Sequence, residues 1–184
     1  MVGVDRNEPA GWKYSTPDTP GLHAAVTPEN SPCRAIQMFR LNLAAGERHV
    51  LSFDALETIT GVVSGSVELS REDERDRLGR LDAFYAPART PVELTAQRDS
   101  ILYIGAAECE GHGAFFVRHN DPDLPLGDIH QIHGKPPYER EVFMALNAEV
   151  PASRLIAGWT FSRPGGWTSW PPHQHENDLE EVYT

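Results

Sequence analysis

Two histidines near the end of the printed sequence, His173 and His175, have the spacing of a metal-binding pair. In a β-strand the side chains at positions i and i+2 project from the same face. Both imidazoles would therefore point in one direction, and such a pair can bind one divalent ion at about 2.0–2.1 Å. The two preceding prolines stiffen the approach to the pair. An isolated pair of this kind is a weak signal, because histidine pairs are also common on protein surfaces.

A glutamate after the pair strengthens the prediction. Glu180 and Glu181 both follow at a distance that allows a turn and a returning strand, so either could supply a third ligand. They would lie on opposite faces of that strand. We predict Glu181 as the ligand, because it shares its face with Tyr183 at the entry to an apolar pair, and Glu180 as its outward neighbour. With His173 and His175, the predicted metal ligands are thus two imidazoles and one carboxylate.

The remaining histidines carry less information about a site. His130 and His133, in GDIHQIHG, are three residues apart, and we expect solvated or hydrogen-bonded loop histidines there. His49 stands where the first half of the chain would place ligands of its own, but no histidine lies two residues away. Glu57 follows further on. We interpret the first half as a metal-free copy of the same architecture.

Short strands joined by turns dominate the first half of the chain, as the fifteen glycines and fifteen prolines suggest. Residues 35–43 alternate between apolar and polar, and 57–70 is interpreted as two strands meeting in a tight hairpin at Ser64-Gly65. The charged run 71–82 suits a solvated loop or hairpin tip. Residues 83–108 supply three further short strands, with Pro87 and Pro91 marking a connection. The pattern predicts a β-sandwich or small barrel.

A second, similar unit follows a long connector rich in proline, glycine and histidine. Three segments of it have strand character, namely 140–150, 153–162 and 180–184. We therefore divide the chain into an N-terminal extension (1–34), a first unit without a metal motif (35–110), a connector (111–139) and the first part of a metal-binding second unit (140–184).

Composition narrows the possible partners. The formal net charge of −11 disfavours nucleic acid and anionic membrane surfaces, both of which select basic patches. No apolar run is long enough for a membrane span, and the N-terminus lacks the apolar core of a secretory signal. The two cysteines are far apart, which disfavours a disulfide framework and favours a reducing compartment. We expect a cytoplasmic protein.

The stretch GGWTSWPPHQHENDLEEVY, with REVFMALNAEVPASRLIAGWTFSRPG before it, resembles the 5-deoxyglucuronate isomerase family of myo-inositol catabolism. The related 5-keto-4-deoxyuronate isomerases of pectin breakdown share the HxH…EVY pattern. The resemblance extends over about residues 30–184 and is strongest at 159–183. It implies an all-β bicupin, that is, two jelly-roll barrels, of which the second is incomplete in this sequence.

The resemblance also implies a divalent metal in the second barrel, with zinc as the first choice and manganese, iron or nickel as alternatives. Family members add a further histidine on a later strand, which would lie beyond Thr184. A barrel with only its first strands would leave open edges. We therefore expect either a fragment, with its activity in doubt, or a neighbouring chain that covers the gap, and we expect a homo-oligomer.

The implied reaction is an aldose–ketose isomerisation of a sugar acid, from 5-deoxyglucuronate to 5-dehydro-2-deoxygluconate. Tyr183 is the candidate catalytic residue in the pocket, although a tyrosine in a barrel core is an equal reading. Arg140 and Lys135 are candidates for binding the substrate carboxylate. Two other functions fit the residues: a non-catalytic bicupin that binds a sugar acid, and another metal-dependent cupin enzyme such as a dioxygenase.

Overall fold

The computed structural model describes residues 13–150, 152–168 and 178–184 of the chain. Every regular element within these ranges is a β-strand. They contain no helix, and hence none that could cross a membrane. The prediction of an all-β protein is confirmed. The strands are β1 (Gly21–Val26), β2 (Ile36–Leu43), β3 (Arg48–Leu51), β4 (Leu56–Arg71), β5 (Glu74–Leu78), β6 (Ala83–Ala86), β7 (Val92–Glu108), β8 (Phe116–Arg118), β9 (His130–His133), β10 (Arg140–Leu146) and β11 (Ala157–Ser162).

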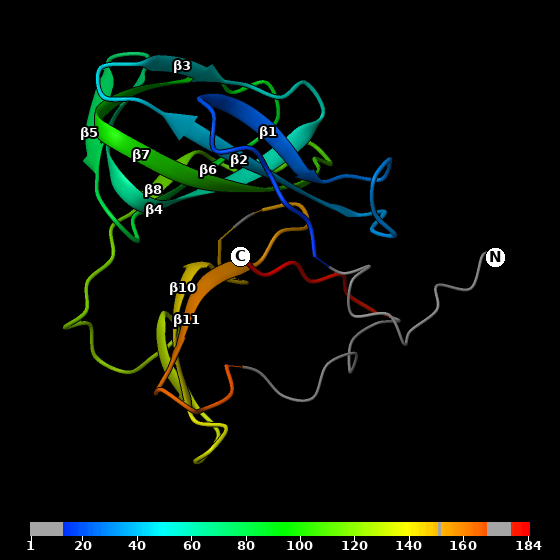
Figure 1. Cartoon of the computed structure of the whole chain (residues 1–184), viewed down its shortest axis with the longest axis vertical. Helices are drawn as coiled ribbons and strands as arrows, with labels where there is room; N and C mark the ends of the chain where they lie inside the picture. Colours follow the sequence, from blue (N-terminus) through cyan, green and yellow to red (C-terminus); the bar gives the residue numbers. More distant parts are fainter. Residues whose placement is uncertain (1–12, 151, 169–177) are drawn as a thin grey trace.

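The first eight strands form one antiparallel sheet, called the first sheet below, in the order β1-β2-β7-β4-β6-β8. The long strands β4 and β7 pair with each other along their whole length. At one end they are flanked by β2 and β6, and at the other end by β3 and β5. The sheet is strongly curled (Figure 1). Its inner face carries the main apolar cluster.

The interior of the first sheet is apolar and fully closed to solvent. β7 shows the expected two-residue alternation, with Val92, Leu94 and Ala96 buried and the residues between them only partly so. The same interior cluster includes the following buried residues of other strands: Leu41, Leu43, Leu51, Val62, Val67, Leu69, Leu78, Phe84, Leu102 and Ile104.

The predicted hairpin at Ser64-Gly65 is wrong. Residues 56–71 form the single strand β4, with register shifts between Val62 and Val67. Both halves of β4 pair with the same continuous partner, so the chain bends there instead of reversing. Gly65 has a φ of +86°, and a Cβ at this position would collide with Ser100 and the backbone of Asp99. The glycine therefore serves a β-bulge and a close backbone approach.

Two other elements differ from the sequence-based expectation. Residues 92–108 form one strand instead of two, and Gly21–Val26, inside the predicted extension, forms β1 and pairs with β2. The charged run 71–82 does contain a hairpin tip, at the turn between β4 and β5. Pro87 and Pro91 lie in the connection between β6 and β7, as predicted.

The last three strands form a separate antiparallel sheet, the second sheet, in the order β11-β10-β9. Figure 1 shows it beside the first sheet, joined to β8 by a long loop. The predicted strand at 180–184 is not formed in this structure. The described residues thus show one curled sheet and a three-stranded second sheet, and a complete second barrel remains a prediction.

The two sheets meet through a second apolar cluster. Ile59, Tyr85 and Ala107 on the outer face of the first sheet pack against Ala145 and other residues of the second unit, including Leu146 and Leu155. Trp159 of β11 adds a polar anchor, since its indole N–H donates to the carbonyl of Leu81 at 2.8 Å.

Candidate functional site

The predicted metal ligands lie near the end of the chain. His173 and His175 are outside the described residues. Glu181 is described, and its side chain is exposed to solvent. Its carboxylate accepts a hydrogen bond from the hydroxyl of Tyr183 at 3.3 Å. Within residues 13–150, 152–168 and 178–184, no three His, Cys, Asp or Glu side chains gather in a way that could hold a metal ion.

Tyr183 does not face a barrel interior in this structure, because residues 180–184 form no strand. Its side chain is 66% exposed. The pairing with Glu181 nevertheless places a phenol beside the predicted ligand. The i, i+2 spacing predicted that the two side chains lie close together. The predicted burial of Tyr183 in a barrel is not seen in this structure.

Glu180 is bound to the first sheet. Its carboxylate accepts backbone N–H groups from Arg34 and Ala35, both at 2.7 Å, and from Ile36 at 2.9 Å. Partial burial opposes ionisation, but these three donors outweigh it and lower the pKa of Glu180. Glu180 is thus occupied by backbone donors, and Glu181 is the carboxylate of this pair that is exposed.

Arg140 begins β10 and lies opposite His133 of β9 and Ser162 of β11. Side chains of directly opposed residues share one face of a sheet. Gln131 and Thr160 belong to the same face, since both lie opposite Val142, and the ring of His133 is 2.7 Å from the amide oxygen of Gln131. We call this set the polar face of the second sheet: Gln131, His133, Arg140, Thr160 and Ser162.

The polar face combines a guanidinium with hydroxyl, amide and imidazole groups. These are the groups that recognise a carboxylate and sugar hydroxyls in proteins. Lys135, the other predicted cation, lies in the exposed turn between β9 and β10. Of the five residues of the polar face, only Arg140 and His133 stood out in the sequence, and His133 was expected to be a loop histidine. The common face depends on strand register, which the local sequence pattern does not reveal.

The opposite face of the second sheet is structural. His130 is buried, and its ring stacks on Phe143 with centroids 4.3 Å apart. Its ring nitrogens are 2.6 Å from the carbonyl oxygen of Leu124 and 2.8 Å from the carboxylate of Glu141. Hydrogen bonding to Leu124, helped by Glu141, raises the pKa of His130. Both nitrogens are therefore engaged, as expected for a hydrogen-bonded histidine. The expected loop is wrong, because His130 and His133 begin and end strand β9.

His49 and Glu57 do not converge on one site in the first sheet. His49 shares its strand face with Leu51 of the interior cluster, and burial lowers its pKa. Glu57 shares its face with Ile59, which belongs to the cluster against the second sheet. The two side chains thus lie on opposite faces of the first sheet.

Glu57 is a fully buried carboxylate with four donors. It accepts the backbone N–H groups of residues 153–155 at 2.6–2.9 Å and the hydroxyl of Tyr85 at 2.7 Å. Burial, reinforced by the bond to Glu57, raises the pKa of Tyr85 far above its usual value, so the phenol stays protonated. No role for Glu57 could be predicted from the sequence, because its hydrogen-bond partners lie far along the chain.

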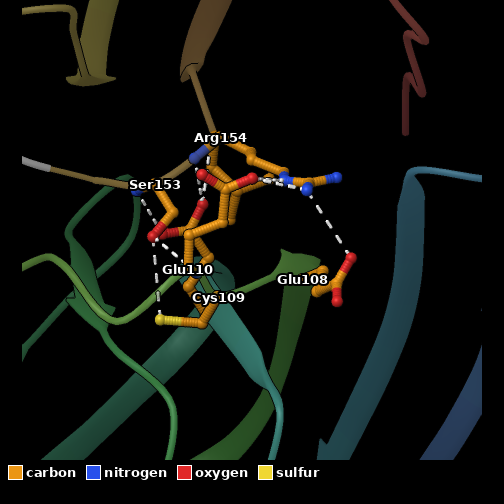
Figure 2. A network of polar contacts seen from close by, with 7 residues as sticks. Glu108, Cys109, Glu110, Ser153 and Arg154 are labelled. Carbon is orange, nitrogen blue, oxygen red and sulfur yellow. Dashed lines mark hydrogen bonds and ion pairs between the residues drawn. The ribbon is translucent and has the colours of Figure 1, made fainter.

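The surroundings of this carboxylate add side-chain contacts. Figure 2 shows Arg154 reaching Glu110, at 3.0 Å from its Nε, and Glu108, at 3.6 Å. The hydroxyl of Ser153 accepts from the backbone N–H of Glu110 at 3.0 Å and lies 3.7 Å from the sulfur of Cys109. A hollow of about 440 Å³ lies nearby and includes Glu108 and Cys109 in its lining. None of the predicted site residues that the structure describes lines it.

Comparison with known proteins decides the family. The profile of the KduI/IolB family matches residues 13–184. The chain belongs to the KduI/IolB family. Among curated proteins it is similar to the 5-deoxy-glucuronate isomerases of Geobacillus kaustophilus, at 27% identity, and Geobacillus thermodenitrificans, at 25%. Both alignments cover 91% of this chain, and 65% and 66% of the relative, respectively. The chain therefore spans about two thirds of the length of these relatives.

A solved structure shows the same fold. The crystal structure of an IolB-like protein from Salmonella typhimurium LT2 matches with a TM-score of 0.73 at 22% identity. The match covers 91% of this chain and 65% of that one. The sequence-based assignment to this family, made on the HxH…EVY stretch, is confirmed.

Proposed function

We propose that this chain takes part in the isomerisation of a sugar acid from aldose to ketose. The proposed substrate is 5-deoxyglucuronate, the product is 5-dehydro-2-deoxygluconate, and the setting is myo-inositol catabolism in the cytoplasm. The observation that carries the proposal is membership of the KduI/IolB family over residues 13–184, with curated relatives named 5-deoxy-glucuronate isomerase. A homo-oligomer is part of the proposal.

A divalent metal, zinc in the first place, is the proposed cofactor, with manganese, iron or nickel as alternatives. Two imidazoles and a carboxylate are a donor set that zinc accepts. His173, His175 and Glu181 would hold the ion, and the exposed carboxylate of Glu181 fits that role. When bound, the ion would supply Lewis-acid polarisation of the substrate carbonyl.

The remaining chemistry belongs to side chains of this chain. Isomerisation moves a proton between two neighbouring carbons of the sugar, which needs a group that can carry it. The hydroxyl of Tyr183, bonded to Glu181 at 3.3 Å, is the proposed carrier. The substrate carboxylate needs a cation, and Arg140 on the polar face is the first candidate, with Lys135 on the adjacent turn as the second.

Metal content and turnover together test the function. The purified chain, loaded with zinc, should convert 5-deoxyglucuronate, followed by NMR, and lose this activity on treatment with a chelator. The double variant His173→Ala/His175→Ala should lose bound zinc and more than about 100-fold in turnover, since even the outer partners of metal ligands contribute 10–100-fold. His112→Ala, an exposed histidine of the first sheet's loops, is the matched control and should retain both.

Each contrary outcome identifies a different error. Zinc retained by the double variant would refute the ligand assignment. Binding of 5-deoxyglucuronate without turnover and without metal dependence would support a sugar-acid-binding protein. Consumption of oxygen by the metal-loaded chain would support a dioxygenase.

A further inference from the structure

Each unit of the chain holds a segment of the other through one glutamate. Glu57 of the first sheet accepts three successive backbone N–H groups, from residues 153–155. Glu180, which follows the second sheet in the chain, accepts three successive N–H groups from residues 34–36 at the start of β2. Three successive backbone N–H groups make a concave site for an anion. The same type of contact thus joins the two units twice. The carboxylate belongs to the first unit in one contact and to the second unit in the other.

We propose that Glu180 is a positioning residue that fixes residues 178–184 on the first sheet and thereby sets the place of Glu181 and Tyr183. The proposal rests on the proposed function in so far as those two side chains act in the reaction. The docking itself rests on contacts that are independent of any reaction.

The amides that Glu180 binds lie at the entry to β2. Arg34 and Ala35 precede this strand and are exposed, so water is the alternative acceptor for their N–H groups. An ionised carboxylate is the stronger type of acceptor for them, because charge-assisted hydrogen bonds exceed neutral ones in strength. Glu180 thus stabilises the entry to β2 at the same time as it anchors the C-terminal segment.

A second contact extends the docking beyond Glu180. Val182 packs against Ala25, Val26 and Met38 of the first sheet. Glu180 and Val182 therefore both face the first sheet, and the residues that alternate with them, Glu181 and Tyr183, are exposed and bonded to each other. The side-chain alternation that leaves Glu181 accessible is thus maintained by the contacts on either side of it.

Hydrogen exchange of the whole chain, measured by mass spectrometry, tests the docking. In Glu180→Gln the amides of 34–36 should exchange at least about tenfold faster than in the parent, because a neutral amide oxygen is a weaker acceptor than the carboxylate and local opening becomes easier. Asp178→Asn removes a charge from the same exposed segment without touching these amides and should leave the exchange unchanged. Glu57→Gln should accelerate exchange at residues 153–155 and spare 34–36. Circular dichroism checks that each variant retains its strands.

Zinc affinity, measured by competition with a chromophoric chelator, tests the positioning. Glu180→Gln should bind zinc about tenfold more weakly than the parent, because an undocked segment must be ordered on binding. Glu180→Asp, which retains the charge on a shorter side chain, should fall between the two. Unchanged exchange at 34–36 in Glu180→Gln would overturn the docking. Unchanged zinc affinity despite faster exchange would overturn the positioning role. A parent that takes up no zinc would refute the proposed metal site, and the exchange data would still decide the docking.

Discussion

Glu57 and Glu180 bind the same pattern of backbone donors, although they lie in different parts of the chain and only Glu57 is fully buried. Each carboxylate accepts three successive backbone N–H groups. A carboxylate taken out of water costs free energy unless its oxygens are hydrogen-bonded. The hydrogen bonds from the backbone N–H groups offset that cost, so both glutamates can stabilise the contact between the units. Nothing in the neighbouring sequence separates them from the exposed glutamates, because their donors are far away in the chain.

His119 is a residue whose charge should matter for stability. It follows β8, and its ring nitrogens lie 3.0 Å from the carboxylate of Asp76 and 3.3 Å from that of Asp82. Partial burial works against the imidazolium, but hydrogen bonds to Asp82 and Asp76 outweigh it and raise the pKa of His119. A raised folded-state pKa gives stability that is present below the unfolded-state pKa and lost as the pH rises through the folded-state value.

The prediction for His119→Gln follows from that sign. The free energy of unfolding, from urea titrations, should drop by more at about pH 5.5 than at about pH 8.5, where less of the parent imidazole is charged. The difference should be at most about 0.5 kcal/mol, because the side chain is 53% exposed and such pairs are screened. His112→Gln, at an exposed histidine outside this ion pair, is the control for the loss of an imidazole. A larger loss at the higher pH would contradict the charged pair.

At the level of elements, the bent strands β4 and β7 determine the shape of the first sheet. Each is long enough to pair with one set of neighbours at one end and with another set at the other end. The bend needs a residue that tolerates a positive φ and the close approach of Ser100, and Gly65 is that residue. The dipeptide Ser64-Gly65 has the same composition as a hairpin turn, so local sequence alone favoured the wrong element.

Gly65→Ala should therefore destabilise the protein more than Gly46→Ala does. Both glycines have a positive φ, +86° and +81°, so both substitutions incur the cost of that conformation. Only at Gly65 would the new methyl collide with backbone atoms, since nothing lies within 4 Å at Gly46. We expect an additional loss of about 1–3 kcal/mol for Gly65→Ala in urea unfolding, the usual range for overpacking. Equal losses would show that the bulge can relax around a methyl group.

In the whole molecule, the outer face of the first sheet serves as a support for the second. Gly61 of β4 lies beneath the indole of Trp159, and a Cβ there would meet two ring carbons at 2.6 and 2.7 Å. The absence of a side chain lets the ring pack close against the strand, within reach of the Leu81 carbonyl. The contact between the sheets thus depends on one glycine and one tryptophan from separate units.

Gly61→Ala should displace Trp159 and loosen the second sheet. We expect a loss of about 1–3 kcal/mol in unfolding free energy and faster hydrogen exchange in β11, with the exchange of β3 unchanged. Gly79→Ala is the matched control, because the nearest atom to its added Cβ, an oxygen of Asp82, is 3.8 Å away. Protection of β11 equal to that of the parent would show that the indole contact does not hold the second sheet.

The sequence by itself determined the features that depend on neighbouring residues. Two-residue alternation identified β2, and Pro87 and Pro91 located the connection between β6 and β7. The HxH…EVY stretch identified the family, which its profile match over 13–184 confirmed. The choice of Glu181 over Glu180 as metal ligand, made from side-chain parity, stays a prediction.

Tertiary structure alone decided what depends on distant partners. Whether residues 56–71 turn back or run on was set by β7, which offers one continuous edge to both halves. The role of Glu57 was set by amides of residues 153–155, and that of Glu180 by amides of residues 34–36. The physical reason is the same in each case: side-chain period is a local property of the backbone, whereas hydrogen-bond partners and burial are chosen among residues that only folding brings together.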